Sequence, residues 1–585
     1  MSAIRILLAL GLPVCLFAGD AAADEPQHLT PVPFPQVHID DTFWNPRLRA
    51  NQTATIAANL RQCEITGRLK NFASAAKQAE GKHQGFLFND SDVYKVIEGI
   101  AYSLTVKRDP ELEKRVDAVI DQIAAAQQPD GYLNTYFTVV KPEERWKGLA
   151  HSHELYCAGH LIEAGVAYYQ ATGKDKLLNV AKKFTDYIIS VFGPGKRIET
   201  SGHEEIELAL IKLYHLTNEQ KYLDQARFFL EVRGRAEQRK LFGEYAQDHK
   251  PIREQDEVTG HAVRAMYLYC AIADLAAIGG DKQLMANLEK IWKDVTERRM
   301  YITGGIGSSA SNEGFTVPYD LPNDAAYCET CAAVGMALWN HRMFLMTGDG
   351  KYADVLERAV YNGLLSGVSL SGDRFFYTNP LASTGKHQRA EWFDCACCPT
   401  NVVRYVPGIG ERMYATRDNQ IYTVLYAANT SDVTVPSGKV KIKQDTHYPW
   451  EENILLRLEP EMPATFGLNL RIPGWCKEFA VLVNGEKHTA ESKNGFVRIE
   501  REWKKGDVVE LKLAMPVQRV HADPNVKADV GRVALQRGPL VYCLEGIGNN
   551  GSVRSLVLPP DSKLTTSWEK DTLGGVVVIC GQALS

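Results

Sequence analysis

The sequence predicts a mainly helical protein that ends in β structure. Apolar residues recur at helical spacing from about residue 48 to residue 415. After residue 416 the pattern changes to short alternating runs separated by turn residues, which is typical of strands. A chain of 585 residues can hold two to four domains. We therefore expect a helical domain over residues 24–415, followed by one or two β-sandwich domains.

The first 23 residues have the features of a secretion signal. Arg5 gives a short basic region, and residues 6–18 form an apolar stretch that is too short to span a membrane. Small residues at 21–23 provide a cleavage site, which would leave Asp24 at the start of the mature chain. We expect that no later stretch is long and apolar enough to span a bilayer, and we expect an exported protein, periplasmic or extracellular.

Helical periodicity defines eleven segments, and a twelfth is expected near residues 49–62. The eleven cover residues 92–107, 110–127, 153–172, 175–192, 203–216, 218–233, 261–278, 281–300, 326–346, 351–366 and 399–415. The breaks at residues 171–176, 216–221 and 346–351 resemble one another, which indicates stacked helical hairpins. Six hairpins fit an open superhelical array or a closed α/α toroid. Long polar insertions favour the toroid, with loops gathered over a central pocket.

Short strands are expected in the C-terminal third. They cover residues 420–426, 439–442, 454–458, 468–472, 480–483, 497–499 and 508–513, with a hairpin turn at Asn484-Gly485. These predict a β-sandwich over residues 416–516. Further runs at 533–537, 540–544 and 576–579 predict a second small β domain over residues 517–585, which is incomplete or borrows strands from elsewhere.

Composition excludes some partners. The net charge is -5 without long runs of one sign, so nothing indicates nucleic acid or an anionic membrane as a partner. The twelve cysteines are not spaced like a small disulfide scaffold. The isolated ones are expected to be buried apolar residues: Cys63, Cys157, Cys270, Cys476, Cys543 and Cys580.

Five cysteines fall in two short stretches, residues 327–331 and 394–401, together with Glu329. Thiolates with one carboxylate suit Zn²⁺ better than a hard cation. Glu329 and Cys331 are two positions apart, so they can meet one ion only at a helix end or a break. Pro399 suits a first helical position, which would place Cys397 and Cys398 just before a helix N-terminus, where the helix dipole favours a thiolate.

Two alternatives remain open for this cluster. A four-ligand zinc site with no open position is more typical of structural than of catalytic zinc. Export would also allow a disulfide among Cys328, Cys331, Cys395, Cys397 and Cys398.

Three histidines, His153, His203 and His261, each stand at the start of an expected helix. In a toroid they would converge on one rim and could contact a ligand. The stretch Asn89-Asp90-Ser91-Asp92 also precedes an expected helix, and N-capping is expected to account for at least one of its acids.

Several of these motifs together resemble glycoside hydrolase family 127 and the related family 146, which include β-L-arabinofuranosidases. The resemblance covers nearly the whole mature chain, and its most specific part is the pair of cysteine motifs. It rests on residues 89–92, 153–156, 202–205, Glu313 ahead of 320–324, 329–331 and 395–399. It implies an (α/α)6 barrel as the catalytic domain, followed by β-sandwich domains.

Carried over by motif, the resemblance implies a role for particular residues. Zinc would be bound by Glu329, Cys331, Cys397 and Cys398. Cys397 would be the nucleophile and Glu313 the general acid/base, and the substrate would contact His153, His203, His261 and Tyr377. A zinc-held thiolate would replace the attacking carboxylate that most glycosidases use. The expected enzyme is a zinc-dependent retaining exo-glycosidase that releases terminal β-L-arabinofuranose from plant-type glycans.

Other functions remain as alternatives. A glycosidase of the same fold could act on a different sugar. An α/α-barrel polysaccharide lyase could use His203 or His261 as a base with Arg264 as the cation that neutralises a uronate. A glycan-binding protein without catalysis could use zinc only to brace the barrel. A homodimer is also compatible with the sequence.

Overall fold

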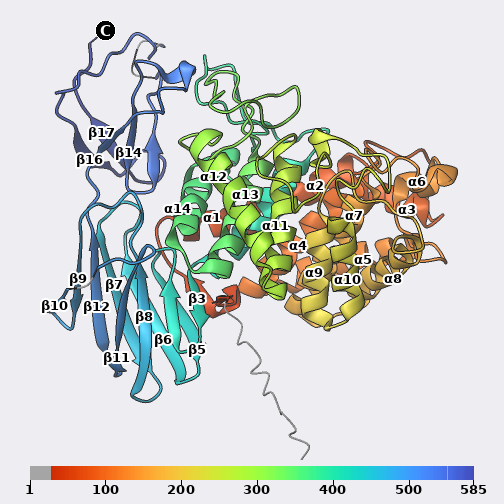
Figure 1. Ribbon diagram of the computed structural model, residues 1–585, viewed down its shortest axis with the longest axis horizontal. Coiled ribbons are helices and arrows are strands. Elements are labelled where there is room, and N and C mark those ends of the chain that lie inside the picture. Colours follow the sequence, from red (N-terminus) through yellow and green to blue (C-terminus); the bar gives the residue numbers. More distant parts are fainter. Residues whose placement is uncertain (1–27, 490, 548, 550, 552, 585) are drawn as a thin grey trace, which may run out of the picture.

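A computed structural model describes residues 28–489, 491–547, 549, 551 and 553–584, so the expected secretion signal lies outside the described residues. A helical part lies beside two β parts (Figure 1). The α-helices are α1 (Trp44–Ala50), α2 (Ile56–Ile65), α3 (Arg68–Ala75), α4 (Asp90–Val106), α5 (Pro110–Ala126), α6 (Thr135–Val139), α7 (Glu154–Thr172), α8 (Lys176–Val191), α9 (Ile206–Thr217), α10 (Gln220–Glu231), α11 (Ala262–Gly279), α12 (Lys282–Arg298), α13 (Thr330–Thr347), α14 (Gly350–Arg358) and α15 (Cys397–Tyr405).

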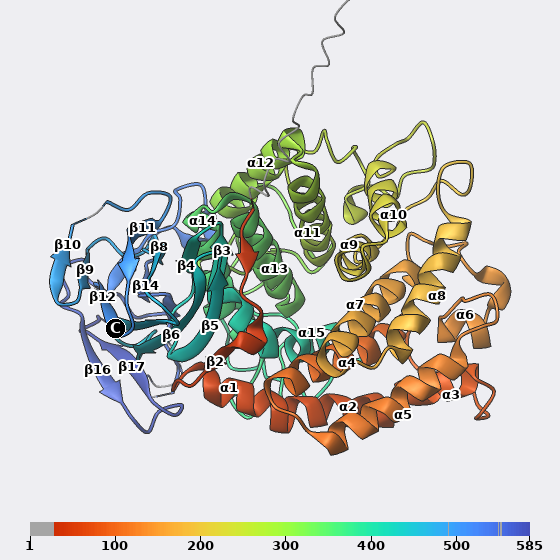
Figure 2. The same cartoon turned by 90° about the horizontal axis from the view of Figure 1, so that it is seen from below.

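Six of these helices contact one another in turn. The contacts run from α4 to α7, α9, α11, α13 and α15, and α15 contacts α4 again. The helices α8, α10, α12 and α14 each pack on the preceding member of this set (Figure 2). The set includes α7, α11 and α13, which are buried on nearly all sides. Helices that are hydrophobic all round belong to a protein interior, so these six form the inner layer.

The helix α11 is apolar enough to be compared with a membrane-spanning helix. Within the described residues, α11 is the one helix that is long and apolar enough to cross a membrane. This contradicts the expectation that no such stretch follows residue 23. However, 78% of that window is buried inside the fold, so the packing of the inner layer accounts for its composition.

The sandwich consists of a five-stranded and a seven-stranded sheet. Their orders are β1-β3-β4-β8-β11 and β10-β9-β12-β7-β6-β5-β2. The strands are β1 (Thr30–Pro31), β2 (Val37–Ile39), β3 (Tyr414–Arg417), β4 (Gln420–Thr423), β5 (Asn429–Val435), β6 (Gly438–Thr446), β7 (Asn453–Pro460), β8 (Ala464–Arg471), β9 (Phe479–Val483), β10 (Glu486–His488), β11 (Phe496–Trp503) and β12 (Asp507–Leu513).

The first two strands come from the segment before the helices, which the sequence placed in the helical domain. Thr30 of β1 pairs with Thr416 of β3, and His38 of β2 pairs with Thr430 of β5. The segment before α1 therefore completes both sheets of the sandwich.

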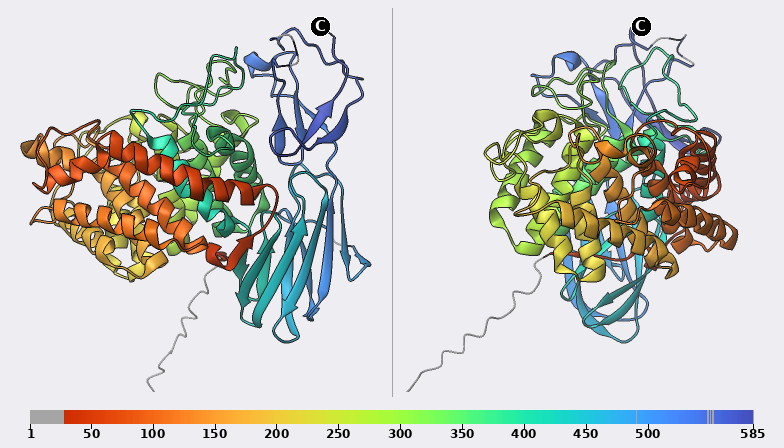
Figure 3. Two further views of the ribbon diagram at one scale, coloured as in Figure 1. Left: turned by 180° about the vertical axis from the view of Figure 1, so that it is seen from behind. Right: turned by 90° about the vertical axis from the view of Figure 1, so that its right-hand side faces the viewer.

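A second β unit follows, with a sheet β13-β14-β15 and a hairpin β16-β17. Its strands are β13 (Gln518–Val520), β14 (Ala534–Arg537), β15 (Leu540–Tyr542), β16 (Thr565–Glu569) and β17 (Val576–Cys580). It lies beside the loops of the helical part (Figure 3). The side-chain amide of Asn323 donates to the Asp529 carboxylate at 2.8 Å. The side-chain amide of Asn362 donates to the backbone carbonyl of Pro539 at 3.0 Å.

A buried ion pair joins the helical part to the sandwich. Arg471 of β8 binds Asp354 of α14 at 2.7 Å and also pairs with Glu357, whose other oxygen accepts from Trp475 Nε1 at 3.1 Å. Arg471 is fully buried. Loss of one member of such a buried pair leaves an uncompensated charge, so this contact holds the two parts in a fixed relation.

Candidate active site

Two helix N-termini bring the predicted cluster together. Glu329 is the residue before α13, and Cys331 is the second residue of that helix. Cys397 and Cys398 are the first two residues of α15. The expectation that Glu329 and Cys331 meet at a helix end is confirmed. The expectation that Cys397 and Cys398 precede the helix is wrong, because Pro399 occupies the third position, where the N–H that proline lacks would have no helical partner anyway.

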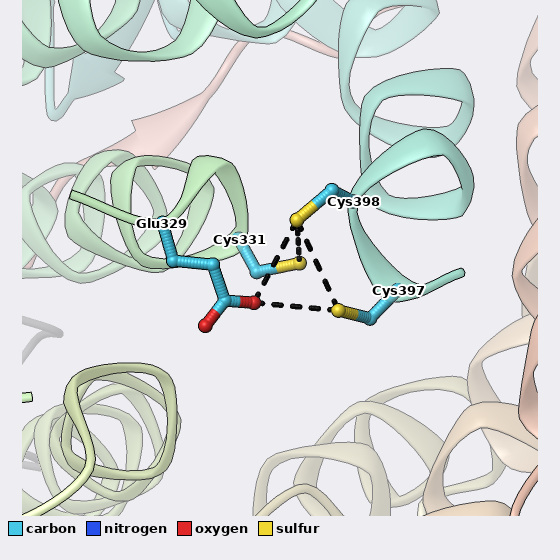
Figure 4. Close-up of side chains that lie close together, drawn as sticks. All are labelled: Glu329, Cys331, Cys397 and Cys398. Carbon is cyan, nitrogen blue, oxygen red and sulfur yellow. Dashed lines mark hydrogen bonds between the residues drawn. The ribbon is translucent and has the colours of Figure 1, made fainter. Parts of the chain in front are cut away.

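The four ligand atoms lie at the spacing of a tetrahedral metal site (Figure 4). Cys331 Sγ and Cys398 Sγ are 3.3 Å apart, and Cys397 Sγ and Cys398 Sγ are 3.9 Å apart. Glu329 Oε1 is 3.3 Å from Cys397 Sγ and 3.7 Å from Cys398 Sγ. Zn–S bonds of about 2.3 Å in a tetrahedron separate the sulfurs by roughly 3.8 Å.

The electrostatics of the cluster favour a cation. Burial raises the pKa of Glu329 well above its usual value, and negative charge on Cys397 raises it further. Glu329 Oε2 is buried without a hydrogen-bond partner. Burial also raises the pKa of Cys398. Acidic groups gathered in a buried site are stabilised by a bound cation, and three sulfurs with one oxygen match zinc.

A disulfide is not formed within the described part of the chain. The eleven cysteines described there are all free. The separation of 3.3 Å between the sulfurs of Cys331 and Cys398 exceeds the S–S bond length of about 2.05 Å. The disulfide alternative is therefore wrong for this structure. Of the isolated cysteines, Cys543 and Cys580 are exposed, so the expectation of burial is wrong for these two.

Glu313 lies on a loop that is fastened to the start of α11. Its backbone has φ = +50°, a left-handed conformation that non-glycine residues rarely adopt. A Cβ on the next residue, Gly314, would lie 1.8 Å from the carbonyl oxygen of Gly260. The amide of Ala262 donates to the carbonyl of Glu313 at 3.1 Å. This close backbone contact places the Glu313 carboxylate next to His261.

Two tyrosine hydroxyls and a histidine surround the Glu313 carboxylate. Tyr245 Oη donates to Oε1 at 2.7 Å, and Tyr327 Oη donates to Oε2 at 3.0 Å. His261 Nε2 lies 3.7 Å from Oε2. The interaction with His261, opposed by burial and assisted by both tyrosines, lowers the pKa of Glu313 to about 2. The carboxyl is therefore ionised at neutral pH before a ligand enters.

The three predicted histidines form a row along one rim. Ring centroids are 5.6 Å apart from His153 to His203, and 5.6 Å from His203 to His261. Burial lowers the pKa of His153 to about 3 and holds the pKa of His203 and His261 below the usual value. All three rings are therefore neutral at neutral pH, which suits hydrogen bonds to uncharged hydroxyl groups.

Neighbouring backbone groups fix which nitrogen of each ring carries hydrogen. Nδ1 of His261 accepts from the amides of Val263 and Arg264, so its Nε2 carries the hydrogen and faces Glu313. Nδ1 of His153 and of His203 faces a backbone carbonyl, at 2.6 Å and 2.9 Å. Those two rings must donate through Nδ1, so each Nε2 carries the lone pair and can accept from a ligand.

Tyr377 lies next to the cysteines. Its hydroxyl is 3.4 Å from Cys397 Sγ and 3.7 Å from Cys395 Sγ. The backbone fixes this position, because the amide of Thr330 donates to the carbonyl of Tyr377 at 2.9 Å. The structure thus brings all the predicted site residues to one end of the inner layer.

Residues 89–92 support the site instead of capping a helix. The N-cap residue is Asn89, whose side chain makes no capping hydrogen bond, and both acids bind other groups, so the expectation that an acid caps this helix is wrong. Asp90 accepts from the amide and hydroxyl of Thr135. Asp92 forms a buried ion pair with Arg68 at 2.8 Å, and Arg68 donates to the carbonyl of Asp394 at 2.8 Å. This chain of contacts anchors the segment that leads into the cysteines.

Sequence reasoning gave no role to Tyr245 or Tyr327. Tyr327 stands next to the cysteine motif, but tyrosine in a loop carries no signal of its own. Tyr245 belongs to a polar insertion far from Glu313 in sequence, and only the fold brings them together. Arg264, considered as a cation for a uronate, is buried, donates to the carbonyl of Gly202 and stacks on the Tyr245 ring at 4.5 Å.

Comparison with known proteins agrees with this geometry. Family models match residues 36–411 (β-L-arabinofuranosidase, GH127 catalytic domain), 420–515 (GH127 middle domain) and 517–577 (glycoside hydrolase family 127 C-terminal domain). A non-reducing end β-L-arabinofuranosidase of Bifidobacterium longum subsp. longum is 38% identical over 554 residues, which cover 86% of this chain and 83% of that protein.

Solved structures of similar proteins cover nearly the whole chain. A GH127 β-L-arabinofuranosidase from Geobacillus stearothermophilus T6 aligns with a TM-score of 0.90 and 44% identity, over 94% of this chain and 92% of that one. A GH127 β-arabinofuranosidase aligns with a TM-score of 0.92 and 44% identity, over 95% of this chain and 91% of that one. Together with the family models, these similarities show that the chain is a glycoside hydrolase homologue that belongs to glycoside hydrolase family 127.

Proposed function

We propose that this protein is an exported, zinc-dependent, retaining exo-glycosidase that releases terminal β-L-arabinofuranose from plant-type glycans. The observation that carries the proposal is the group of four donors, Glu329, Cys331, Cys397 and Cys398, whose ligand atoms lie within 4.8 Å of one another. Its relatives in the same family supply the sugar specificity. The closed sequence of inner-helix contacts supports an (α/α)6 barrel as the frame.

Export rests on the N-terminal sequence alone, as residues 1–23 have the pattern of a secretion signal. The homodimer also stays a prediction.

In the first step, the Cys397 thiolate attacks the anomeric carbon of the sugar. The bond from that carbon to the leaving oxygen breaks, and Glu313 gives this oxygen a proton. A zinc ion held by the four donors would keep Cys397 deprotonated near neutral pH. The product of this step is a thioglycosyl enzyme, in which the sugar is bonded to Cys397 Sγ.

In the second step, Glu313 takes a proton from water, the water oxygen bonds to the anomeric carbon, and the C–S bond breaks. Two inversions at this carbon give retention of configuration. Glu313 is already ionised in the free enzyme, which suits this second step. For the first step, the carboxyl must bind a proton in the substrate complex, where the sugar excludes water from it and favours the neutral form.

The neutral histidines favour this function over the lyase. A lyase acts on a uronate and needs a free cation to neutralise it. Arg264 is buried and already bound to Gly202 and Tyr245, and burial keeps the rings of His203 and His261 uncharged. An uncharged pentose fits these groups, because its hydroxyls can both donate and accept.

A chromogenic β-L-arabinofuranoside tests the proposal. Wild type, Cys397→Ser and Glu313→Gln would be compared for sugar release, with the zinc content of each measured. We expect Glu313→Gln to keep its zinc and to lose activity by at least about 100-fold. Cys397→Ser should lose activity as well. Full activity in Cys397→Ser would refute the thiolate mechanism and leave zinc, if bound, as structural. No turnover by a zinc-loaded wild type would point to a different sugar or to a protein that only binds glycans.

A further inference from the structure

The inner helix α4 carries a buried lysine, Lys95. Lys95 is 0% exposed, and its Nζ donates to Tyr156 Oη at 2.9 Å. No ion pair involves Lys95 among the described residues, whereas two other cations of the inner helices have carboxylate partners. Arg404 binds Glu98 and Glu163, and Lys212 binds the same two carboxylates. A buried charge without a compensating charge is unfavourable, so Lys95 requires an explanation.

The position of Lys95 follows from two contacts between α4 and α15. Near the start of both helices, Asp92 is linked through a buried arginine to the carbonyl of Asp394. Farther along, Glu98 binds Arg404 at 3.0 Å. The two helices therefore run in the same direction, and early residues of one lie level with early residues of the other. Lys95 lies between these two contacts, level with the first residues of α15, where two of the four ligands are.

Tyr156 of α7 connects Lys95 to the site. Its ring packs on His203 with a centroid separation of 4.3 Å. Burial raises the pKa of Tyr156 well above its usual value, and negative charge on Tyr267, Cys397 and Cys331 raises it further. The hydroxyl therefore stays protonated.

The charges of the proposed metal site do not balance without a further cation. Three thiolates and one carboxylate carry about four negative charges, and a divalent ion offsets two of them. We infer that Lys95, held by Tyr156, is a positioning residue whose buried ammonium offsets part of this excess negative charge and thereby strengthens metal binding. The inference rests on the proposed function, since it requires that the four donors hold zinc.

The test is the affinity for zinc alone, measured by competition with a chromophoric chelator at neutral pH. Lys95→Met removes the charge and keeps most of the side-chain volume. We expect its zinc affinity to fall about 10- to 100-fold, the range typical when a residue that supports a metal ligand is lost. Lys95→Arg keeps the charge and should recover at least part of the loss.

Lys212→Met is the matched control. Lys212 is also a lysine of the inner helices that binds a tyrosine hydroxyl, Tyr102, at 2.9 Å, but its charge is already balanced by Glu98 and Glu163. We expect its zinc affinity to stay within about threefold of wild type, even if the protein melts at a lower temperature.

The outcomes separate this inference from the proposed function. Wild-type affinity in Lys95→Met, with a wild type that binds one zinc, would overturn the inference alone. An equal loss in Lys212→Met would overturn it too, because the effect would then be general. Failure of the wild type to bind zinc would overturn the proposed metal site and the inference with it. Should Lys95→Met not fold, Lys95→Gln makes the same comparison, because it removes the charge while keeping a donor for Tyr156.

Discussion

The hydrogen bonds to Glu313 make a quantitative prediction about pH dependence. Tyr327 Oη donates to Oε2 at 3.0 Å, and Tyr245 Oη donates to Oε1 at 2.7 Å. Both bonds stabilise the carboxylate, so removal of either hydroxyl raises the pKa of Glu313. A hydrogen bond to a charged group contributes about 1.5–3 kcal/mol, and one pKa unit corresponds to about 1.4 kcal/mol. Each Tyr→Phe change should therefore raise this pKa by roughly one to two units.

The sign of the effect on activity follows from the first step. Glu313 must hold a proton to protonate the leaving oxygen, and a higher pKa preserves that proton to higher pH. In Tyr327→Phe, the alkaline limb of the plot of kcat against pH should move to higher pH by about one to two pH units. The assay is hydrolysis of a chromogenic arabinofuranoside across the range of pH in which the protein stays folded.

Tyr301→Phe is the matched control for this experiment. Tyr301 donates to the carbonyl of Pro322 at 3.0 Å and does not contact Glu313. Its substitution removes a tyrosine hydroxyl from the same group of loops and should leave the alkaline limb in place. If the alkaline limb stays at the same pH in both Tyr327→Phe and Tyr245→Phe, or moves to lower pH, the role of Glu313 as the acid is refuted.

Three further substitutions test the geometry of the site. Cys395→Ser should keep one bound zinc, because Cys395 is not among the four clustered donors. The measurement is the zinc content of Cys395→Ser compared with that of Cys397→Ser, and loss of zinc in Cys395→Ser would show a different ligand set. Gly314→Ala should lose activity by about 100-fold while keeping zinc, because its Cβ would lie 1.8 Å from the carbonyl of Gly260 and displace Glu313; wild-type kcat/KM would contradict this. Arg68→Met should destabilise the protein by about 3–5 kcal/mol by leaving Asp92 buried and unpaired, as measured by urea denaturation, and a change under about 1 kcal/mol would show that Asp92 finds another partner.

The helical half of the fold could be predicted because its signals are local. The breaks near Gly173, Asn218 and Gly348 are helix ends with left-handed caps, and each is followed by a new helix. Apolar periodicity gave the helices between them. The strands β1 and β2 escaped prediction because they are two and three residues long. Their stability comes from pairing with β3 and β5, almost 400 residues later, and no local pattern records such a pairing.

The candidate site likewise contains residues that a local sequence pattern identifies and residues that it does not. Cys331, Cys397 and Cys398 could be identified because clustered thiols with a carboxylate are chemically unusual. Glu313 has no such signal, since a glutamate followed by glycine in a loop is ordinary, and its role came only from the family resemblance. What distinguishes Glu313 is its setting: a left-handed backbone, a glycine contact with the start of α11, and two tyrosine hydroxyls and a histidine from separate parts of the chain. These donors hold the carboxyl ionised, so the enzyme must gain the proton that it needs when the sugar replaces water around Glu313. Removal of a tyrosine donor should therefore change the pH dependence of the first step more than it changes zinc binding. Loss of the Lys95 charge should change zinc binding more than it changes the pH dependence of the first step.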